Sequence, residues 1–355
     1  MSNSNSLKDF EKKLREIARQ NQTPLYGGFE LTSRCNFDCK MCYVHLPDSE
    51  KIRKKELSTT EVLDIIEKAC NAGMLYATLS GGECLLRKDF EEIYMFLIRH
   101  GVKVILKTNG FLIRKFLPLF KIYPPYKISV SFYGSNEEVY EKVTGVRGFE
   151  VVKNALRSIT ELHIPLTVSV TPSRFCYEDV PNIVAFLNQN HYKYIISPFL
   201  IPPRGEIERD EYYLTPEEQL QMFVSIRKQL GKALYDNDTD RLPHPGGNAS
   251  NSPSGIECSA GSYRFNVTWD GFMVPCYCFD APHIDIRQYG FSEAWRQLVE
   301  NNQKVVQPVE CVNCAYKKIC IFCPFIRYSS PYTGHCNKDL CHFILEKVKR
   351  GIVKL

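Results

Sequence analysis

Short apolar runs alternate with longer segments of helical periodicity over roughly the first two thirds of the chain. The runs typical of strands are LYGGFEL at 25–31, YATLS at 76–80, VKVILKT at 102–108, KISVSF at 127–132, LTVSV at 166–170 and YIISPFL at 194–200. Helical patterns occupy 6–19, 59–72, 88–100, 112–121, 149–162 and 179–189. This alternation predicts right-handed βαβ units and a parallel sheet, with functional groups at the carboxyl ends of the strands.

Six strands are too few to close a barrel of eight units. We therefore expect an α/β protein built on a partial (β/α)6 TIM-like barrel, whose open side admits a large substrate. Thr215 and Pro216 form a favourable N-cap and N1 pair for a further helix. The segment that follows is rich in Gly, Pro, Ser and Asn, which predicts a linker or a functional loop.

These patterns divide the chain into four regions. The expected regions are an N-terminal amphipathic helix in 1–24, the partial barrel in 25–230, the linker or loop in 231–257 and a small cysteine-rich domain in 258–355. The last region contains a hairpin-like run at 263–277, short helices and a closing helix near 339–349.

Composition and charge exclude several classes of protein. Apolar residues make up 44% and charged residues 24%, which is ordinary for a globular protein. The formal net charge of +5 is spread along the chain and favours neither nucleic acid nor a membrane surface as partner. The start of the chain lacks the apolar stretch of a signal peptide, and no window reaches the ~18 apolar residues of a membrane span. We expect a cytoplasmic protein.

Fifteen cysteines are the unusual feature of this composition. In a reducing compartment such thiols more often bind metal or perform chemistry than form disulfides. Cys35, Cys39 and Cys42 follow the first predicted strand directly, and nine others lie between Cys258 and Cys341. A structural zinc site needs four protein ligands, and no fourth lies near the first three. Three thiolates on a four-iron cluster would leave one iron open to a small molecule.

The spacing Cys-x3-Cys-x2-Cys after the first strand of a βα array resembles the signature of the radical S-adenosylmethionine (SAM) enzymes. The resemblance implies a [4Fe-4S] cluster whose open iron is chelated by the amino and carboxylate groups of SAM. The stretch YATLSGGE strengthens it, because Gly81, Gly82 and Glu83 match the family's Gly-Gly-Glu turn. By this resemblance the backbone and carboxylate of the turn hold the methionine amino group, and the glycines let the backbone approach the ligand.

Further residues match family positions that face the cofactor. They are Tyr43, Thr108, Asn109, Ser131 and Arg147. The resemblance implies ribose contacts for Thr108, Asn109 and Ser131, and a pairing of the Arg147 guanidinium with the methionine carboxylate. An aromatic residue usually precedes the last cysteine of the motif, whereas here Met41 precedes it and Tyr43 follows.

The C-terminal cysteines resemble the SPASM extension of radical SAM enzymes, which binds two auxiliary [4Fe-4S] clusters. The pattern runs Cys258, twelve residues, Gly271, four residues, Cys276, then Cys311-x2-Cys314-x5-Cys320-x2-Cys323, Cys336 and Cys341. The resemblance implies that Cys258, Cys276 and Cys323 hold the first auxiliary cluster, and that Cys311, Cys314, Cys320 and Cys341 hold the second.

Several features depart from the SPASM pattern. The family usually has three residues between the last two cysteines of the run, and here there are two. The fourth ligand of the first auxiliary cluster is either Cys278 or an open position. Cys336 competes with Cys341, and the longer spacing favours Cys341. A zinc ribbon is the alternative for this region, but it needs its CxxC pairs farther apart.

The resemblance implies reductive cleavage of SAM to a 5′-deoxyadenosyl radical that removes hydrogen from a substrate. Enzymes with the SPASM pattern mostly modify peptides or proteins, so we expect an anaerobic oxidoreductase of ribosomal peptide maturation, which makes a crosslink or thioether, epimerises or oxidises a residue. The implied partners are a peptide or protein substrate and an electron donor such as flavodoxin or ferredoxin. Since residues 1–24 leave little room before the first strand, a separate protein is one candidate for leader-peptide recognition.

Three alternatives remain open, and no catalytic base is assigned. One is a SPASM enzyme that acts on a small molecule such as a tetrapyrrole or heme precursor. Another is a formylglycine-forming enzyme like the anaerobic sulfatase maturases, which carry an aspartate directly after the Gly-x4-Cys cysteine. This chain has Tyr277 there, and Asp280 is the nearest carboxylate that follows. The third alternative, from a different class, is a zinc-binding scaffold or nucleic-acid module.

Overall fold

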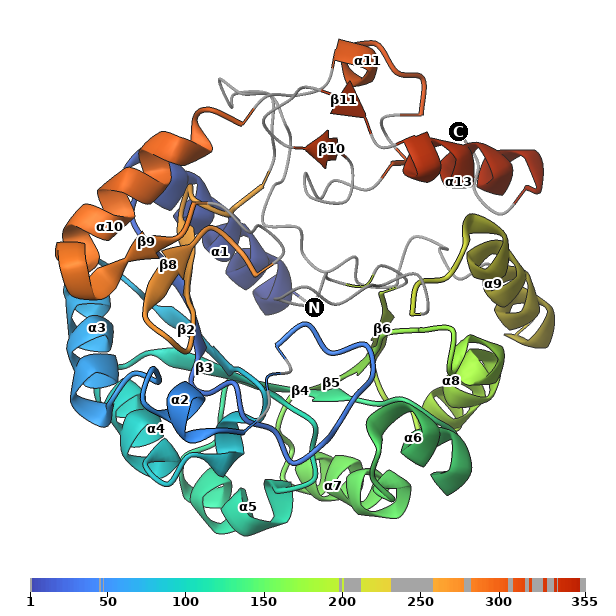
Figure 1. Ribbon diagram of the computed structural model, residues 1–355, viewed down its shortest axis with the longest axis horizontal. Helices are drawn as coiled ribbons and strands as arrows, with labels where there is room; N and C mark the ends of the chain where they lie inside the picture. Colours follow the sequence, from blue (N-terminus) through green and yellow to red (C-terminus); the bar gives the residue numbers. More distant parts are fainter. Residues whose placement is uncertain are drawn as a thin grey trace.

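An open sheet of nine strands organises the chain (Figure 1). This computed structural model describes residues 2–44, 46, 48–197, 200, 212–230, 258–277, 282–305, 309–316, 319–320, 328–330, 335–336 and 338–351. The strands of the sheet are β1 (Tyr26–Glu30), β2 (Tyr76–Ser80), β3 (Lys103–Thr108), β4 (Lys127–Ser131), β5 (Leu166–Val170), β6 (Tyr194–Ile196), β7 (Arg264–Val267), β8 (Phe272–Val274) and β9 (Ile284–Asp285). Their order across the sheet is β6-β5-β4-β3-β2-β1-β7-β8-β9.

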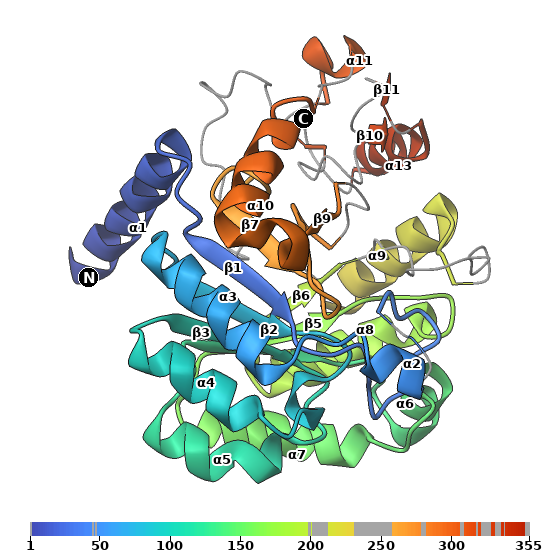
Figure 2. The same cartoon turned by 60° about the vertical axis from the view of Figure 1, so that its left-hand side comes forward.

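Helices follow most strands and cover the outer face of the sheet (Figures 1 and 2). The described helices of the whole chain are α1 (Ser2–Gln20), α2 (Glu50–Arg53), α3 (Thr59–Asn71), η1 (Cys84–Leu86), α4 (Phe90–Arg99), α5 (Ile113–Ile122), α6 (Glu137–Thr144), α7 (Phe149–Glu161), η2 (Tyr177–Asp179), α8 (Val180–Gln189), α9 (Pro216–Leu230), α10 (Ile286–Asn302), α11 (Val309–Val312) and α13 (Lys338–Lys349). A further short pair consists of β10 (Tyr328–Ser330) and β11 (His335–Cys336).

Local sequence explains why these helices form and which face they bury. Helix α3 begins at a capping box, in which Ser58 and Glu61 satisfy each other's backbone N–H groups. Helix α7 buries Val152, Leu156 and Ile159, which recur at helical spacing, against the sheet. The resulting core runs continuously from β1 through the βα units to α10 and α13.

The predicted partial (β/α)6 barrel is confirmed, because β1 to β6 pair in parallel and in chain order. The sheet also extends beyond these six strands. Strand β7 pairs in parallel with β1, with Tyr26 opposite Arg264, and forms the predicted antiparallel hairpin with β8. In the described residues β6 and β9 are the two ends of the sheet, so the barrel stays open.

The elements that carry the later cysteines lie together at one side of the barrel. Figures 1 and 2 show α11, β10, β11 and α13 grouped beyond the open side of the sheet. Helix α13, the predicted closing helix, packs against α9, where the Phe223 and Phe343 ring centroids are 6.3 Å apart. The predicted linker at 231–257 lies outside the described residues. Within the described part of the chain, none of the helices combines the length and apolar character that crossing a membrane requires.

Candidate functional site

The carboxyl ends of three neighbouring strands bring the first group of predicted residues together. Strands β1, β2 and β3 run in parallel and in register, so the segments that leave them meet at one edge of the sheet. The cysteine loop, residues 35–42, follows β1; the glycine pair follows β2; Thr108 and Asn109 end β3. This shared edge is the candidate site.

Gly81 and Gly82 let the backbone leading into the cysteine loop lie directly against the end of β2. Gly82 N donates to Thr32 O at 2.8 Å, and Glu83 N donates to Arg34 O at 2.8 Å. A Cβ on Gly81, where φ is +135°, would lie 2.3 Å from Thr32 O, and one on Gly82 would lie 2.2 Å from Arg34 O. The close approach that these glycines permit is therefore to the chain's own backbone. Their predicted contact with the methionine amino group remains a prediction.

Glu83 joins the ends of β2 and β3 through a fully buried carboxylate. Its Oε2 accepts hydrogen bonds from Thr108 Oγ1 at 2.9 Å and Asn109 N at 2.8 Å, and its Oε1 accepts from Leu85 N at 3.0 Å. Burial raises the pKa of Glu83, and these hydrogen bonds partly oppose the shift. Both oxygens have donors from this chain, and the predicted contact of the Glu83 carboxylate and the turn backbone with the methionine amino group remains a prediction.

Asn109 connects the end of β3 to the first cysteine. Its Nδ2 lies 3.6 Å from Cys35 Sγ and donates to Asn36 Oδ1 at 2.8 Å, while its Oδ1 accepts from Phe111 N at 3.0 Å. The side-chain amide is thus directed toward the cysteine loop. The ribose contacts predicted for Asn109 and Thr108 stay predictions.

The three thiols of the cysteine loop lie within electrostatic range of one another. Burial raises the pKa of Cys35 to about 12 and also raises that of Cys39, and the neighbouring thiols add to both shifts. The loop is shaped by backbone hydrogen bonds, including Asp38 N to Thr144 O at 2.8 Å and Cys42 N to Cys39 O at 3.0 Å. Three half-buried thiolates so close together require positive charge between them.

Three cysteine thiols in one loop are a donor set that fits an iron–sulfur cluster. Among the described residues, no group of three or more His, Cys, Asp or Glu side chains is placed to hold one metal ion. In a four-iron cluster each thiolate binds a different iron, so the sulfurs stand around the cluster and not around one atom. Cys35, Cys39 and Cys42 are partly buried in one loop and suit that pattern.

Three other predicted residues lie around the same edge. The side chain of Ser131, at the end of β4, hydrogen-bonds to Tyr133, whose pKa is raised by burial. Arg147 is 69% exposed and its Nη1 donates to Glu141 Oε2 at 3.2 Å. The ring of Tyr43 lies 6.4 Å from that of Tyr277, between centroids. Their roles toward SAM remain predictions.

In the C-terminal part, the structure gathers three cysteines from three short elements. Cys336 Sγ on β11 lies 3.1 Å from Cys341 Sγ on α13, and Cys336 also hydrogen-bonds to Cys311 of α11. Burial raises the pKa of Cys336, and the two other thiols add to the shift. Of the two competitors for the second auxiliary cluster, Cys336 therefore contacts Cys311 directly, and Cys341 lies beside Cys336.

The structure describes the surroundings of the other predicted ligand cysteines less completely. Cys258 packs against the cluster formed by Val305 and Cys311, and Cys276, Cys314 and Cys320 are each partly buried. Cys323, Cys278 and Asp280 lie outside the described residues. All of the ligand sets for auxiliary clusters stay predictions.

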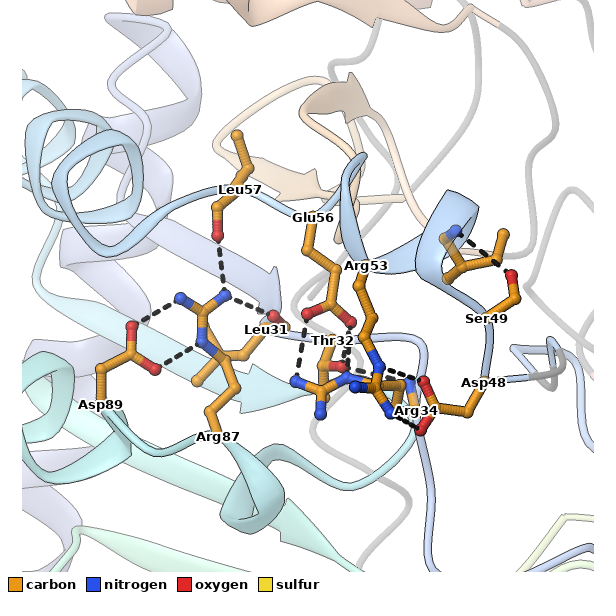
Figure 3. Close-up of polar contacts among 11 residues, drawn as sticks. Leu31, Thr32, Arg34, Asp48, Ser49, Arg53, Glu56, Leu57, Arg87 and Asp89 are labelled. Atoms are coloured by element: carbon orange, nitrogen blue, oxygen red, sulfur yellow. Dashed lines mark hydrogen bonds and ion pairs between the residues drawn. The ribbon is translucent and has the colours of Figure 1, made fainter.

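Two residues outside the predicted set hold the cysteine loop in place. Arg34, which directly precedes Cys35, pairs with Glu56 through Nε to Oε1 and Nη2 to Oε2, both at 3.1 Å (Figure 3). The position of Arg34 beside the motif is a signal in the sequence. Glu56 has none, because it lies 22 residues away with no pattern linking the two.

Comparison with known proteins places these features in one superfamily. The profile of the radical SAM superfamily matches residues 29–187. The chain is 31% identical over 266 residues to a probable GTP 3′,8-cyclase of Saccharolobus islandicus, covering 72% of this chain and 83% of the relative. It is 26% identical over 325 residues to the mycofactocin maturase MftC of Mycolicibacterium smegmatis, covering 89% and 81%.

An AdoMet-dependent heme synthase of Methanosarcina barkeri is a further relative, 24% identical over 331 residues, which cover 86% of this chain and 93% of the relative. Two solved structures share the fold. Streptococcus suis SuiB bound to the precursor peptide SuiA superposes with a TM-score of 0.65 at 16% identity, covering 95% of this chain and 81% of SuiB. The protein anSMEcpe with bound AdoMet and the Kp18Cys peptide superposes with a TM-score of 0.66 at 17% identity, covering 93% and 98%.

Proposed function

We propose that this chain, which belongs to the radical SAM superfamily, removes a hydrogen atom from a peptide or protein substrate. The family implies an enzyme that uses a [4Fe-4S] cluster and SAM. When both are bound, reductive cleavage of SAM supplies the 5′-deoxyadenosyl radical on which this chemistry depends. The observation that carries the proposal is a cysteine loop held at the ends of β2 and β3, in a chain that matches the mycofactocin maturase over 89% of its length.

The residues at the sheet edge have distinct tasks under this proposal. Cys35, Cys39 and Cys42 hold the cluster, and the backbone of Gly81 and Gly82 together with the Glu83 carboxylate holds the methionine amino group of SAM. Glu83 keeps the ends of β2 and β3 together, so that the cysteine loop and the cofactor-facing strand ends keep a fixed spacing. Fixed placement matters because the position of the radical decides which hydrogen of the substrate is lost.

Three further positions complete the SAM site that we propose. Ser131 at the end of β4 faces the ribose. Arg147 pairs with the methionine carboxylate, for which its guanidinium must turn from Glu141, and its high exposure leaves room for this movement. The ring of Tyr43 lies beside the adenine, on the side of Tyr277.

A peptide substrate is supported by the relatives and by the open sheet. The solved SuiB and anSMEcpe complexes hold the precursor peptide SuiA and the Kp18Cys peptide, and a further relative is named as a maturase. Strand β6 ends the sheet in the described residues, and an extended peptide can add to such an edge through backbone hydrogen bonds. The modification would be a crosslink, thioether, epimerisation or oxidation.

The C-terminal cysteines supply two auxiliary [4Fe-4S] clusters in this proposal. Cys258, Cys276 and Cys323 hold the first, with Cys278 or an open position as the fourth ligand. Cys311, Cys314, Cys320 and Cys341 hold the second, and Cys311 and Cys341 flank Cys336 in the structure. These clusters would take up the electron released when product forms. An electron donor such as flavodoxin or ferredoxin and a separate leader-peptide-binding protein are the proposed partners.

The decisive experiment uses the full chain purified without oxygen. Three clusters correspond to about twelve irons per chain. With a reductant and SAM, the protein should release 5′-deoxyadenosine, and mass spectrometry should detect a mass change in a co-expressed peptide encoded beside the gene. Zinc in place of iron, or no 5′-deoxyadenosine, would contradict the proposal and favour a metal-binding scaffold.

A tetrapyrrole substrate is the second candidate, because the heme synthase relative aligns along 86% of this chain. The same preparation separates the two. A heme precursor that is consumed with stoichiometric 5′-deoxyadenosine, alongside an unchanged peptide, would favour this candidate. The formylglycine alternative predicts oxidation of a cysteine or serine in a sulfatase-derived peptide instead.

A further inference from the structure

The short segment from Lys54 to Leu57, here named the brace, contacts both the residues that lead into the cysteine loop and the C-terminal hairpin. On the barrel side, the Glu56 carboxylate accepts two hydrogen bonds from Arg34, each 3.1 Å long. It also accepts a short hydrogen bond from Thr32 Oγ1. The Glu56 and Arg34 side chains are 10% and 26% exposed, so the pair is largely shielded from water.

Hydrogen bonds fix the backbone of Arg34, which leads directly into the cysteine loop. Its carbonyl accepts from Glu83 N at 2.8 Å, and its own N–H donates to Thr32 Oγ1 at 3.1 Å. The next residue is Cys35. Two parallel hydrogen bonds from the planar guanidinium to Glu56 fix both the position and the direction of the Arg34 side chain. Glu56 therefore restrains the backbone from which the first thiol projects.

The brace is fixed from the other side as well. Leu57 N donates to Trp269 O at 2.9 Å, in the turn of the β7–β8 hairpin. Arg287, at the start of α10, donates from Nη2 to Lys55 O at 3.2 Å and from Nη1 to Asp270 O at 2.7 Å. The hairpin and α10 thus hold the brace, and the brace holds the cysteine loop.

Arg87 closes the arrangement on the barrel side (Figure 3). Its Nη1 donates to Leu31 O at 2.8 Å and to Leu57 O at 2.9 Å, which ties the end of β1 to the end of the brace. Asp89 orients this guanidinium through both of its oxygens. The segment on each side of Glu56 is consequently anchored to a different part of the protein.

We propose that Glu56 is a positioning residue for the cluster of the cysteine loop, and that the brace links this loop to the C-terminal hairpin. The inference rests on membership of the radical SAM superfamily and not on the nature of the substrate. Partners that orient metal ligands without touching the metal typically change metal affinity or activity by about 10–100-fold when they are removed.

The test compares two carboxylate–arginine pairs in the same segment. Glu56→Gln breaks the shielded pair, and Asp48→Asn breaks a pair of the same forked geometry, in which Arg53 donates to Asp48 at 2.7 and 2.6 Å (Figure 3). The Asp48 and Arg53 side chains are 47% and 59% exposed, and among the described contacts no hydrogen bond joins this pair to Arg34, Thr32 or Glu56, so that only a solvent-screened charge interaction connects the two pairs. It is therefore a matched control.

The measured quantity is the rate at which an anoxic chelator removes the cluster from the full holoprotein. The part of the electron paramagnetic resonance signal that changes on adding SAM reports this cluster separately from any auxiliary one. Glu56→Gln should lose that signal about 10–100-fold faster than the wild type, and Asp48→Asn should match the wild type. Equal rates for all three proteins would overturn the proposal.

A second variant keeps the proposal testable if Glu56→Gln does not fold. Arg34→Lys retains the positive charge but cannot make two parallel hydrogen bonds. It should show wild-type circular dichroism together with faster loss of the SAM-responsive signal. In the metal-free Arg34→Lys protein, trypsin should also cleave after exposed Lys40 faster than in Asp48→Asn. Wild-type cluster loss in a folded Arg34→Lys protein would refute the positioning role.

Discussion

The cysteine loop and the cysteines of the C-terminal part are held in contrasting ways. The loop at 35–42 is bound by backbone hydrogen bonds to α6, and the residues that lead into it, Thr32 and Arg34, are bound to the end of β2 and to Glu56. Cys311, Cys336 and Cys341 come from three short elements, and the described contacts among them run between their sulfurs. Backbone hydrogen bonds thus position the thiols of the cysteine loop. The described contacts that bring Cys311, Cys336 and Cys341 together are between the thiols themselves.

Loss of one thiol from the cysteine loop gives the largest expected effect. Cys42→Ala should reduce 5′-deoxyadenosine formation to the background of a protein-free assay, since two thiolates do not hold a four-iron cluster with one open iron. Cys70→Ala, on the outer helix α3, is the control and should keep the wild-type rate. Activity that survives in Cys42→Ala would remove this loop from the site.

Removal of Cys341 and removal of Cys336 should have different effects on the iron content of the protein. Cys341→Ala should lower the iron content by about four per chain, while Cys336→Ala should leave it unchanged. Iron and sulfide analysis of anoxically prepared protein measures both. Because the two sulfurs lie 3.1 Å apart, an exchange of ligands would appear as unchanged iron in each single variant and loss in the double variant. That result would contradict the choice of Cys341.

The backbone packing of the cysteine loop can be tested with two glycines of positive φ. Gly81→Ala should cost about 1–3 kcal/mol of unfolding free energy from overpacking against Thr32 O, in addition to backbone strain. At Gly101, with φ +71°, a Cβ meets no described atom within 4 Å, so Gly101→Ala carries only the strain, about 1–2 kcal/mol.

Urea denaturation of the metal-free proteins measures the difference between the two glycine variants. The metal-free state is used because it isolates the backbone contribution. Equal destabilisation in both variants would mean that the loop yields to the added methyl group, and the proposed preformed loop would then be wrong.

The smallest effect concerns the link between α3 and α10. Arg287 Nε donates to Glu61 Oε1 at 2.6 Å, and this contact lowers the pKa of Glu61 to about 2. A carboxylate with a lowered pKa stabilises the fold above its unfolded value, and the contribution is lost as the pH falls toward 2. Both side chains are more than a third exposed, so the effect should stay within about 0.2–1 kcal/mol.

Glu61→Gln should therefore be slightly less stable than the wild type at pH 7, and the difference should shrink between pH 4.5 and pH 2. Denaturant titrations at several pH values measure this. Lys68, which pairs with Asp64 on the exposed face of α3, offers a matched control through Asp64→Asn. A difference for Glu61→Gln that persists unchanged at the acid end would exclude Arg287 as its cause.

The sequence predicted the elements of the barrel closely. Strands β2 and β5 have the predicted bounds, and α3 and α7 differ from prediction by one residue at the end. Apolar periodicity is a local property, so it survives into the fold wherever a helix or strand buries one face. Helices α6 and α10 were not predicted. The first is only eight residues long, and the second contains Gly290 with a non-helical conformation.

The candidate site was predicted in part, by residue type and not by contact. The three cysteines, the glycine pair and Asn109 do meet at one sheet edge, because consecutive parallel strands place their carboxyl ends together. The approach of Gly82 to the backbone of Arg34 could not be foreseen, and neither could the inward carboxylate of Glu83. Such details depend on the register between strands.

By itself the sequence determined the order of the barrel elements and the spacing of the thiols, since both depend on neighbours along the chain. Only the tertiary structure decided that β7 lies beside β1, that Glu56 grips Arg34 and that Cys336 lies next to both Cys311 and Cys341. These contacts join segments far apart in sequence, and their partners are selected by packing and by the burial of charge. Local sequence patterns therefore do not predict these contacts.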